Sequence, residues 1–187
     1  YALRATQGVP APFIELRAMG DKGEVPSDGK TPGELEVRGA WIAASYHEMP
    51  EAQDRWTKDG WFKTGDVATL DESGRMRITD RTKDLIKSGG EWISSVDLEN
   101  LLMGHPSLKE ACVIAVPHPK WDERPLAVCV KKDGVNVTEQ EIKEWIATKV
   151  AKWSIPDGVV FVDAIPRTSA GKFLKRELRD KYKDHAW

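Results

Sequence analysis

The sequence is poor in cysteine, and it has neither a long apolar run nor an excess of charge of one sign. Its two cysteines, Cys112 and Cys129, lie in apolar runs, which predicts buried thiols in a reducing compartment and argues against a disulfide. No stretch of about 20 apolar residues is present, which excludes a transmembrane helix. Lysine and arginine number 28 against 30 acidic residues, and the net charge of −2 gives no field that attracts nucleic acid or an anionic membrane.

The sequence also lacks the residue spacing of a metal site or of a catalytic triad. The four histidines show no ligand spacing with one another or with the cysteines, and no Ser-His-Asp or Cys-His set is apparent. These histidines are His47, His105, His118 and His185. A signal-peptide pattern is absent too, but the chain opens with Tyr1 and not with methionine. We therefore expect a fragment of a longer, cytoplasmic protein, and its missing N-terminal region leaves targeting open.

The sequence does have enough apolar residues, 40% of the total, to bury a core. The first block, residues 1–80, has the pattern of β structure, because apolar and polar residues alternate in 12–18 and 34–39. A hairpin follows these strands, with its turn at 71–74 and a return strand that starts at Met76.

The second block, residues 81–187, mixes strands with helices. Continuous apolar runs at 111–116, 126–131 and 159–162 have the length of buried strands. Alternation of strands and helices favours a small sheet with helices packed on it. The predicted fold class is therefore α+β, in which a β-rich block precedes a small α/β block with a short sheet flanked by helices.

Three helices are expected in the second block. The first is capped by Ser95 and ends before His105, and the second begins at a capping box formed by Thr138 and Glu141. The third is a basic helix at the end of the chain, with Leu174, Leu178 and Tyr182 in register. Between the two blocks, the stretch 80–84 holds no apolar residue, so we expect it to lie outside the core and to act as a hinge or linker.

Three polar motifs are candidates for chemistry. In Thr64-Gly65-Asp66, a carboxylate at a strand end can accept hydrogen bonds from both hydroxyls of a ribose, or it can be a plain turn residue. The paired glycines Gly89 and Gly90 allow another group to approach the backbone closely, or they form a turn before the helix. They do not belong to a Walker-type phosphate loop, which would end in Gly-Lys-Ser/Thr.

The third motif is the loop 166–172, which ends in Lys172. An ammonium group there can reach a carboxylate or a phosphate, or it can be solvated at a helix start. A lysine in the first turn of a helix opposes the helix dipole, so its position needs another reason. In a separate polar loop between prolines, Trp121 can stack on a flat ligand such as adenine or cover a domain edge.

The order and spacing of these motifs resemble the adenylate-forming enzymes, a family that includes acyl-CoA synthetases, luciferases and peptide-synthetase adenylation domains. The matching segments are 33–39, 61–66, 81–99 and 166–172. The resemblance implies that residues 1–80 are the C-terminal β-subdomain of a large AMP-binding domain, present in part. It also implies that residues 81–187 are the mobile C-terminal domain of such an enzyme.

The resemblance implies roles in two half-reactions. Asp66 would bind the ribose of ATP and of the acyl-adenylate, and Arg81 would contact the same nucleotide. Lys172 would contact the substrate carboxylate and the α-phosphate, and Lys83 would be the hinge.

In the thioester-forming state, Gly89 and Gly90 would line the pantetheine tunnel, Trp121 would lie near the CoA adenine, and Lys87 would approach the adenylate. The segment 153–157 has no basic residue where some relatives contact the CoA phosphates.

The expected function is ATP-dependent activation of a carboxylic acid, a medium- or long-chain fatty acid, followed by transfer to CoA. ATP/AMP, CoA and Mg²⁺ are the implied cofactors, and the Mg²⁺ ligands would lie outside this sequence. The implied partners are the acid, ATP, CoA and the missing N-terminal domain, and a homo-oligomer is allowed. The fragment alone is expected to be inactive. The alternatives are a ligase for another acid and a non-catalytic module that binds CoA or a partner protein.

Overall fold

The computed structural model describes residues 4 and 6–187, so residues 1–3 and 5 of the predicted first block lie outside the described residues. The chain forms two compact units, a first unit of Tyr1–Lys83 and a second unit of Asp84–Trp187. Within the described part of the chain, no helix is both long and apolar enough to cross a membrane.

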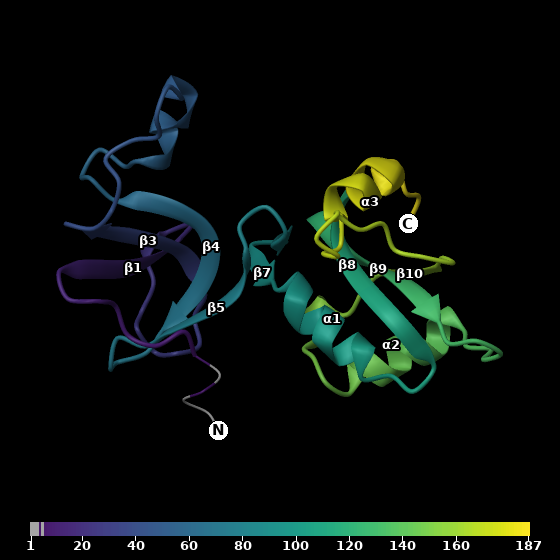
Figure 1. The fold of residues 1–187 in the computed structure, drawn as a ribbon. Helices are drawn as coiled ribbons and strands as arrows, with labels where there is room; N and C mark the ends of the chain where they lie inside the picture. The colour runs from purple at the N-terminus through teal and green to yellow at the C-terminus, as the bar shows by residue number, and fades with distance from the viewer. Residues whose placement is uncertain (1–3, 5) are drawn as a thin grey trace. The chain divides into compact units, whose positions relative to one another are not determined.

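The first unit is a five-stranded antiparallel sheet with the strand order β2-β1-β3-β4-β5 (Figure 1). The strands are β1 (Ile14–Gly20), β2 (Gly23–Glu24), β3 (Gly33–Gly39), β4 (Phe62–Leu70) and β5 (Met76–Arg81), with a 3-10 helix, η2 (Pro50–Arg55), between β3 and β4. The β-rich character and the β4–β5 hairpin are as predicted. The turn of that hairpin is held by Asp71, whose carboxylate accepts hydrogen bonds from the backbone N–H groups of Ser73 and Arg75.

The end of β5 departs from the prediction that residues 80–84 lie outside the core. Asp80 is only 3% exposed, and its carboxylate accepts a hydrogen bond from the backbone N–H of Arg81. A hydrogen-bonded carboxylate can be buried, so the absence of apolar residues was not sufficient to exclude burial. The boundary between the two compact units falls after Lys83.

The second unit is a mixed sheet built around two long antiparallel strands, β8 (Leu108–His118) and β9 (Asp122–Lys131). On its other side, β9 pairs in parallel with β10 (Gly158–Phe161) and touches the short hairpin of β6 (Ile86–Ser88) and β7 (Glu91–Ile93). The three predicted strands are confirmed, with longer bounds for the first two. The β6–β7 hairpin was not predicted.

Helices cover both faces of this second sheet (Figure 1). One face packs against α1 (Ser95–Met103) and α2 (Glu139–Ala147), and the other packs against α3 (Lys175–Tyr182). The two cysteines are buried and unpaired on opposite faces, Cys112 toward α3 and Cys129 toward α1 and α2. Burial raises the pKa of both thiols, that of Cys129 to about 12, as expected for inert core residues.

The helix boundaries correct the sequence predictions in detail. Ser94, one residue earlier than expected, caps α1 by accepting a hydrogen bond from the N–H of Asp97. The capping box of Thr138 and Glu141 is confirmed. The first helical residue of α3 is Lys175, so Lys172 precedes the helix. Lys172 therefore does not oppose a helix dipole, and that prediction was wrong.

Candidate functional site

Asp66 and Arg81 lie side by side on β4 and β5 of the first unit. They are paired in register, and the Arg81 Nε is 3.9 Å from Asp66 Oδ1. The side chain of Asp66 is 33% exposed, which leaves it accessible to a ligand. The prediction of a strand end was wrong, because Asp66 lies inside β4.

Irregular backbone around Asp66 aims this carboxylate. The pairing of β4 with β3 shifts register between Glu34 and Glu36, which pair with Val67 and Lys63, and Gly65 has a φ of +78°, which favours glycine. The Thr64 hydroxyl donates to the carbonyl of Leu35 and accepts from the N–H of Asp66. The Thr-Gly pair therefore forms a bulge that fixes the direction of Asp66.

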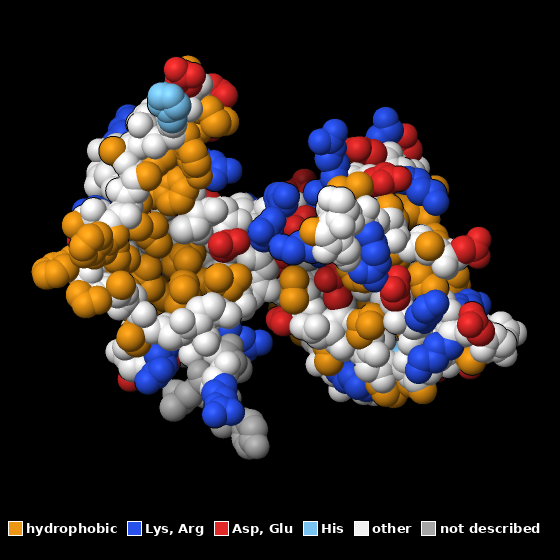
Figure 2. Space-filling view, in the orientation of Figure 1, with side chains coloured by type: hydrophobic (Ala, Val, Ile, Leu, Met, Phe, Trp, Pro, Cys, Tyr) orange, Lys and Arg blue, Asp and Glu red, His pale blue; other side chains and the backbone are white. Residues whose placement is uncertain are grey.

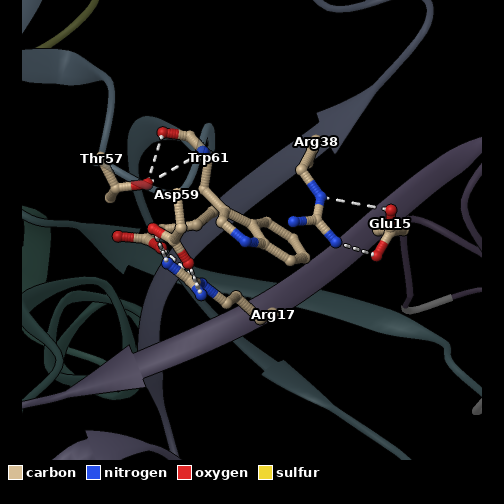
Figure 3. Close-up of polar contacts among 7 residues, drawn as sticks. Glu15, Arg17, Arg38, Thr57, Asp59 and Trp61 are labelled. Atoms are coloured by element: carbon tan, nitrogen blue, oxygen red, sulfur yellow. Dashed lines mark hydrogen bonds and ion pairs between the residues drawn. The ribbon is translucent and has the colours of Figure 1, made fainter.

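A cluster of charged residues around Trp61 supports the start of the same strand (Figure 3). The Trp61 ring lies between two guanidinium groups, with Arg17 at 4.4 Å and Arg38 at 4.5 Å from its centroid. Arg17 also donates to Asp59 at 2.9 Å, and Arg38 pairs with Glu15 at 2.6 Å. These contacts anchor the segment that leads into the Thr-Gly-Asp motif.

Gly89 and Gly90 form the two-residue turn of the β6–β7 hairpin. Their φ values are +58° and +88°, which L side chains rarely adopt. Gly89 also allows a close approach, because a Cβ placed there would lie 3.0 Å from the ring of Trp121. Its N–H donates to the carbonyl of Trp121. The turn drawn from the sequence is therefore confirmed, and the packing of Trp121 is a second reason for glycine at position 89.

Trp121 borders an open hollow of about 440 Å³ beside this hairpin. A second tryptophan, Trp153, lies on its wall, and the two are 42% and 46% exposed. The lining consists of Ser88, Gly89, Glu91, Trp121, Arg124, Lys152, Trp153 and Asp157. Sequence reasoning missed Arg124 and Trp153 as site residues, although Trp153, like Trp121, directly follows a lysine and stands a few residues before a proline.

Lys87 lies on β6, directly before this turn. Its N–H donates to the Glu123 carboxylate, and its ammonium group lies 5.2 Å from the centroid of the Trp92 ring. The side chain is therefore close to the glycine turn and in contact with an aromatic face.

Lys172 lies at the end of a tight turn that its own backbone closes. The carbonyl of Lys172 accepts from the N–H of Thr168, and its N–H donates to the Thr168 hydroxyl. Arg167 locks the turn by donating to the Gly171 carbonyl and, at 2.6 Å, to Glu110 on β8. Lys172 is exposed, and within the described residues no hydrogen bond or ion pair holds its ammonium group.

The second unit thus carries its candidate residues in two separate places. The Lys172 turn is attached near the start of β8 through Glu110, whereas Trp121 follows the end of that strand at His118. At about 3.3 Å per residue, the eight steps from 110 to 118 span roughly 26 Å. Nothing among the described residues forms a group of three or more metal-ligating side chains.

Comparison with known proteins agrees with this architecture. Residues 97–172 match the AMP-binding enzyme C-terminal domain. The chain is 55% identical over 185 residues to a 3-methylmercaptopropionyl-CoA ligase of Ruegeria lacuscaerulensis, covering 98% of this chain and 34% of that protein. It is also 55% identical over 186 residues to a long-chain-fatty-acid–CoA ligase of Thermus thermophilus, with the same coverage. The structure of ATP-bound MatB from Rhodopseudomonas palustris matches with a TM-score of 0.83 and 33% identity, over 96% of this chain and 36% of MatB.

These matches and the fold of the second unit define its class as an AMP-binding enzyme C-terminal domain. Residues 97–172 therefore carry this domain, the relatives of the chain are named as CoA ligases, and the resemblance drawn from the motifs is confirmed. It spans about a third of the length of the curated relatives that it matches.

Proposed function

We propose that this chain is part of an ATP-dependent acyl-CoA synthetase, which activates a carboxylic acid as an acyl-adenylate and transfers the acyl group to CoA. The observation that carries this proposal is the Lys172 turn. Its backbone is locked by Arg167, while its ammonium group is exposed. A cation carried by a locked backbone turn suits a reaction in which negative charge accumulates at one place.

In the adenylation step, an oxygen of the acid carboxylate attacks the α-phosphorus of ATP and pyrophosphate leaves. Two anions approach each other, and the Lys172 ammonium offsets their repulsion. Asp66 accepts hydrogen bonds from the ribose hydroxyls, and Arg81, paired with it across β4 and β5, contacts the same nucleotide. No step is assigned to Mg²⁺, because the described residues contain no group of ligands that fits it.

In the thioester step, the CoA sulfur attacks the acyl carbon, the bond from that carbon to the phosphate oxygen breaks so that AMP leaves, and the thiol proton passes to solvent. The backbone of Gly89 and Gly90 lines the path of the pantetheine arm, since neither residue has a side chain to obstruct it. Trp121 stacks on the adenine of CoA, and Lys87 approaches the adenylate. The exposure of Trp121 beside the hollow supports this assignment.

The two steps require different groups at the same reaction centre, so we propose that the second unit rotates about Lys83. The boundary between the compact units directly after Lys83 supports this hinge. The first unit would then be the end of a larger AMP-binding domain. Its strongly exposed Phe13 and Trp41, at 80% and 71%, suit burial against the rest of such a domain. The two free, buried thiols suit a reducing cytoplasmic location.

The proposed substrate is a medium- or long-chain fatty acid. A relative named as a long-chain-fatty-acid–CoA ligase supports this choice. A short sulfur-bearing acid is the second candidate, because a relative named for 3-methylmercaptopropionate is just as similar, at 55% identity. A non-catalytic module that binds CoA has no use for the Lys172 turn, and we rank it below both.

The test is acid-dependent release of pyrophosphate by the full-length enzyme, measured over fatty acids of increasing length and over 3-methylmercaptopropionate. Release that peaks with a medium or long chain and is followed by acyl-CoA formation supports the proposal. A peak with 3-methylmercaptopropionate selects the second candidate. Absence of release with every acid, together with binding of CoA, would favour the non-catalytic module.

A further inference from the structure

The hollow beside the β6–β7 hairpin contains one buried cation, Arg124 on β9. Its side chain is 9% exposed, although the residue lies on the wall of an open hollow. A buried guanidinium is stable only when its donors and its charge are satisfied. The partners of Arg124 therefore show what it does in this place.

The four N–H bonds at the end of the guanidinium are matched by four hydrogen bonds. One terminal nitrogen donates to the hydroxyl of Ser88 at 2.9 Å and to the carbonyl of Trp153 at 2.7 Å. The other donates to the carbonyl of Ile155 at 2.9 Å and to the carboxylate of Asp157 at 2.7 Å. The remaining N–H, at Nε, is buried and has no partner in the described part of the chain.

These four bonds join segments that are far apart in the sequence. Ser88 ends β6 and directly precedes the Gly89–Gly90 turn. The segment between α2 and β10 carries Trp153, in the 3-10 helix η3 (Lys152–Ser154), and Asp157. That segment is also tied by the N–H of Asp157 to Pro125 and by the ammonium of Lys143 to the Asp157 carbonyl. Arg124 is thus the link between the glycine turn and the segment that carries Trp153.

The link determines the two aromatic walls of the hollow. On one side, Gly89 packs against the Trp121 ring and bonds to its carbonyl, so the turn fixes Trp121. On the other side, Arg124 binds the carbonyl of Trp153 itself. A change in the position of Arg124 would alter the spacing of the two indole rings.

The same contacts exclude a direct role for Arg124 in binding a phosphate. Its terminal donors are all engaged, and the Asp157 carboxylate balances its charge. Two half-exposed indoles and a neutralised cation suit an uncharged planar heterocycle, which gains affinity by stacking.

We propose that Arg124 is a positioning residue, which sets the gap between Trp121 and Trp153 so that the hollow accepts the purine ring of a nucleotide ligand. The inference rests on the proposed function, because that function supplies CoA as the ligand that carries such a ring. It adds the second wall, Trp153, and the residue that holds both walls in place.

The experiment is an NMR titration of the ¹⁵N-labelled 187-residue chain with CoA, observing the indole N–H signals of its eight tryptophans. Trp121→Phe and Trp153→Phe assign the two signals of the hollow. The signals of Trp61 and Trp145 report whether the first and the second unit stay folded. Trp61 is buried in the first unit, and Trp145 on α2 donates to the Leu101 carbonyl on α1 in the second.

Two variants remove the link, and one matched variant controls for the chemical change. Arg124→Met removes all four bonds, and Arg124→Lys keeps the charge but lacks the planar fork that spans the four acceptors. Arg176→Met makes the same change on α3, where the side chain is 85% exposed. Ser88→Ala removes only the bond from Arg124 to the residue before the glycine turn. If Arg124→Met fails to fold, the Kd of Ser88→Ala for CoA tests the positioning role instead.

We expect CoA to shift the Trp121 and Trp153 signals in the wild type and in Arg176→Met. Both Arg124 variants should raise the Kd for CoA at least about tenfold and move the free Trp153 signal, while the Trp61 and Trp145 signals stay in place. Ser88→Ala should weaken binding by a smaller factor. If the Kd for CoA of the Arg124 variants stays within about twofold of wild type, the positioning role of Arg124 is overturned and the proposed function still stands. If those variants do not fold, the same result in Ser88→Ala overturns it. CoA that shifts neither indole in the wild type overturns the assignment of the hollow itself, and pyrophosphate release tests the proposed function separately.

Discussion

Gly89 and Gly90 are adjacent residues with similar backbone conformations and different surroundings. Both have positive φ, so alanine at either position costs about 1–2 kcal/mol of strain. Only at Gly89 does the added Cβ meet the Trp121 ring, at 3.0 Å, whereas nothing lies within 4 Å of a Cβ at Gly90. We predict that Gly89→Ala lowers the free energy of unfolding more than Gly90→Ala does, and that it alone shifts the Trp121 indole signal. Equal effects of the two variants, measured by urea unfolding and NMR, would contradict the close packing described here.

Asp59 makes the stability of the first unit depend on pH. Arg17 donates to its carboxylate (Figure 3). Hydrogen bonds from Arg17 and then from Thr57 lower the pKa of this carboxyl to about 2, whereas an unfolded aspartate titrates near 3.9. The stabilisation is therefore complete above about pH 4, and it is lost as the pH falls toward about 2. We predict that Asp59→Asn unfolds at lower urea concentration at pH 6 and shows a shallower loss of stability between pH 4 and pH 2. If Asp59→Asn loses stability between pH 4 and pH 2 as steeply as the wild type, Asp59 is not a source of the acid dependence.

At the scale of residues, the sequence predicted candidate site residues that belong to contiguous motifs, such as Asp66, Gly89 and Lys172. It did not identify Arg124 or Trp153, because their roles depend on contacts between residues 29 to 36 positions apart. A buried arginine has no local signature in a sequence, and its partners become evident only when the strands are assembled.

At the scale of elements, the capping box at the start of α2 is a local interaction that the sequence predicts in full. The Thr138 hydroxyl accepts from the N–H of Glu141, and the Glu141 carboxylate accepts from the N–H of Thr138. We predict that Thr138→Ala lowers the free energy of unfolding by about 1 kcal/mol, measured by urea unfolding of the chain. Gln140→Ala, an exposed change in the same helix, should alter it by less than about 0.5 kcal/mol. A neutral Thr138→Ala would show that α2 is held by packing alone.

Strands with clear alternation or long apolar runs, such as β3 and β8, were predicted from the sequence. The β6–β7 hairpin was not, because each strand has only three residues and their neighbours include Lys87, Ser88 and Glu91. Its existence depends on pairing with β9 and on the two glycines that close the turn. Short strands whose partners lie elsewhere in the sequence lack a periodic signal of their own.

At the scale of the whole molecule, the α+β fold class followed from the order of the elements. Figure 2 shows acidic and basic side chains interspersed over the second unit, as the near-zero net charge suggests. The burial of Asp80 could not be deduced, because it depends on hydrogen bonds formed only in the folded chain.

The 187 residues span about a third of the curated relatives, and we place the acyl pocket outside them. We predict that the purified chain forms no acyl-CoA from ATP, CoA and any fatty acid, even though it is folded. Thioester formation detected by mass spectrometry at a rate above the enzyme-free control would contradict the proposed division of labour.

The central claim is that Lys172 serves the adenylation step, and it is tested by separating the two half-reactions in the full-length enzyme. Pyrophosphate release with acid and ATP measures adenylation, and acyl-CoA formation from a supplied acyl-adenylate measures thioester formation. Lys172→Ala is compared with Lys183→Ala, an exposed lysine at the end of α3.

We predict that Lys172→Ala lowers adenylation by roughly 10²–10³-fold, as expected for loss of a positioned group that stabilises charge, and leaves thioester formation within a few-fold. Lys183→Ala should leave both rates unchanged. Unchanged adenylation in Lys172→Ala, or an equal loss of both half-reactions, would contradict the assignment of this lysine and with it the account of the site.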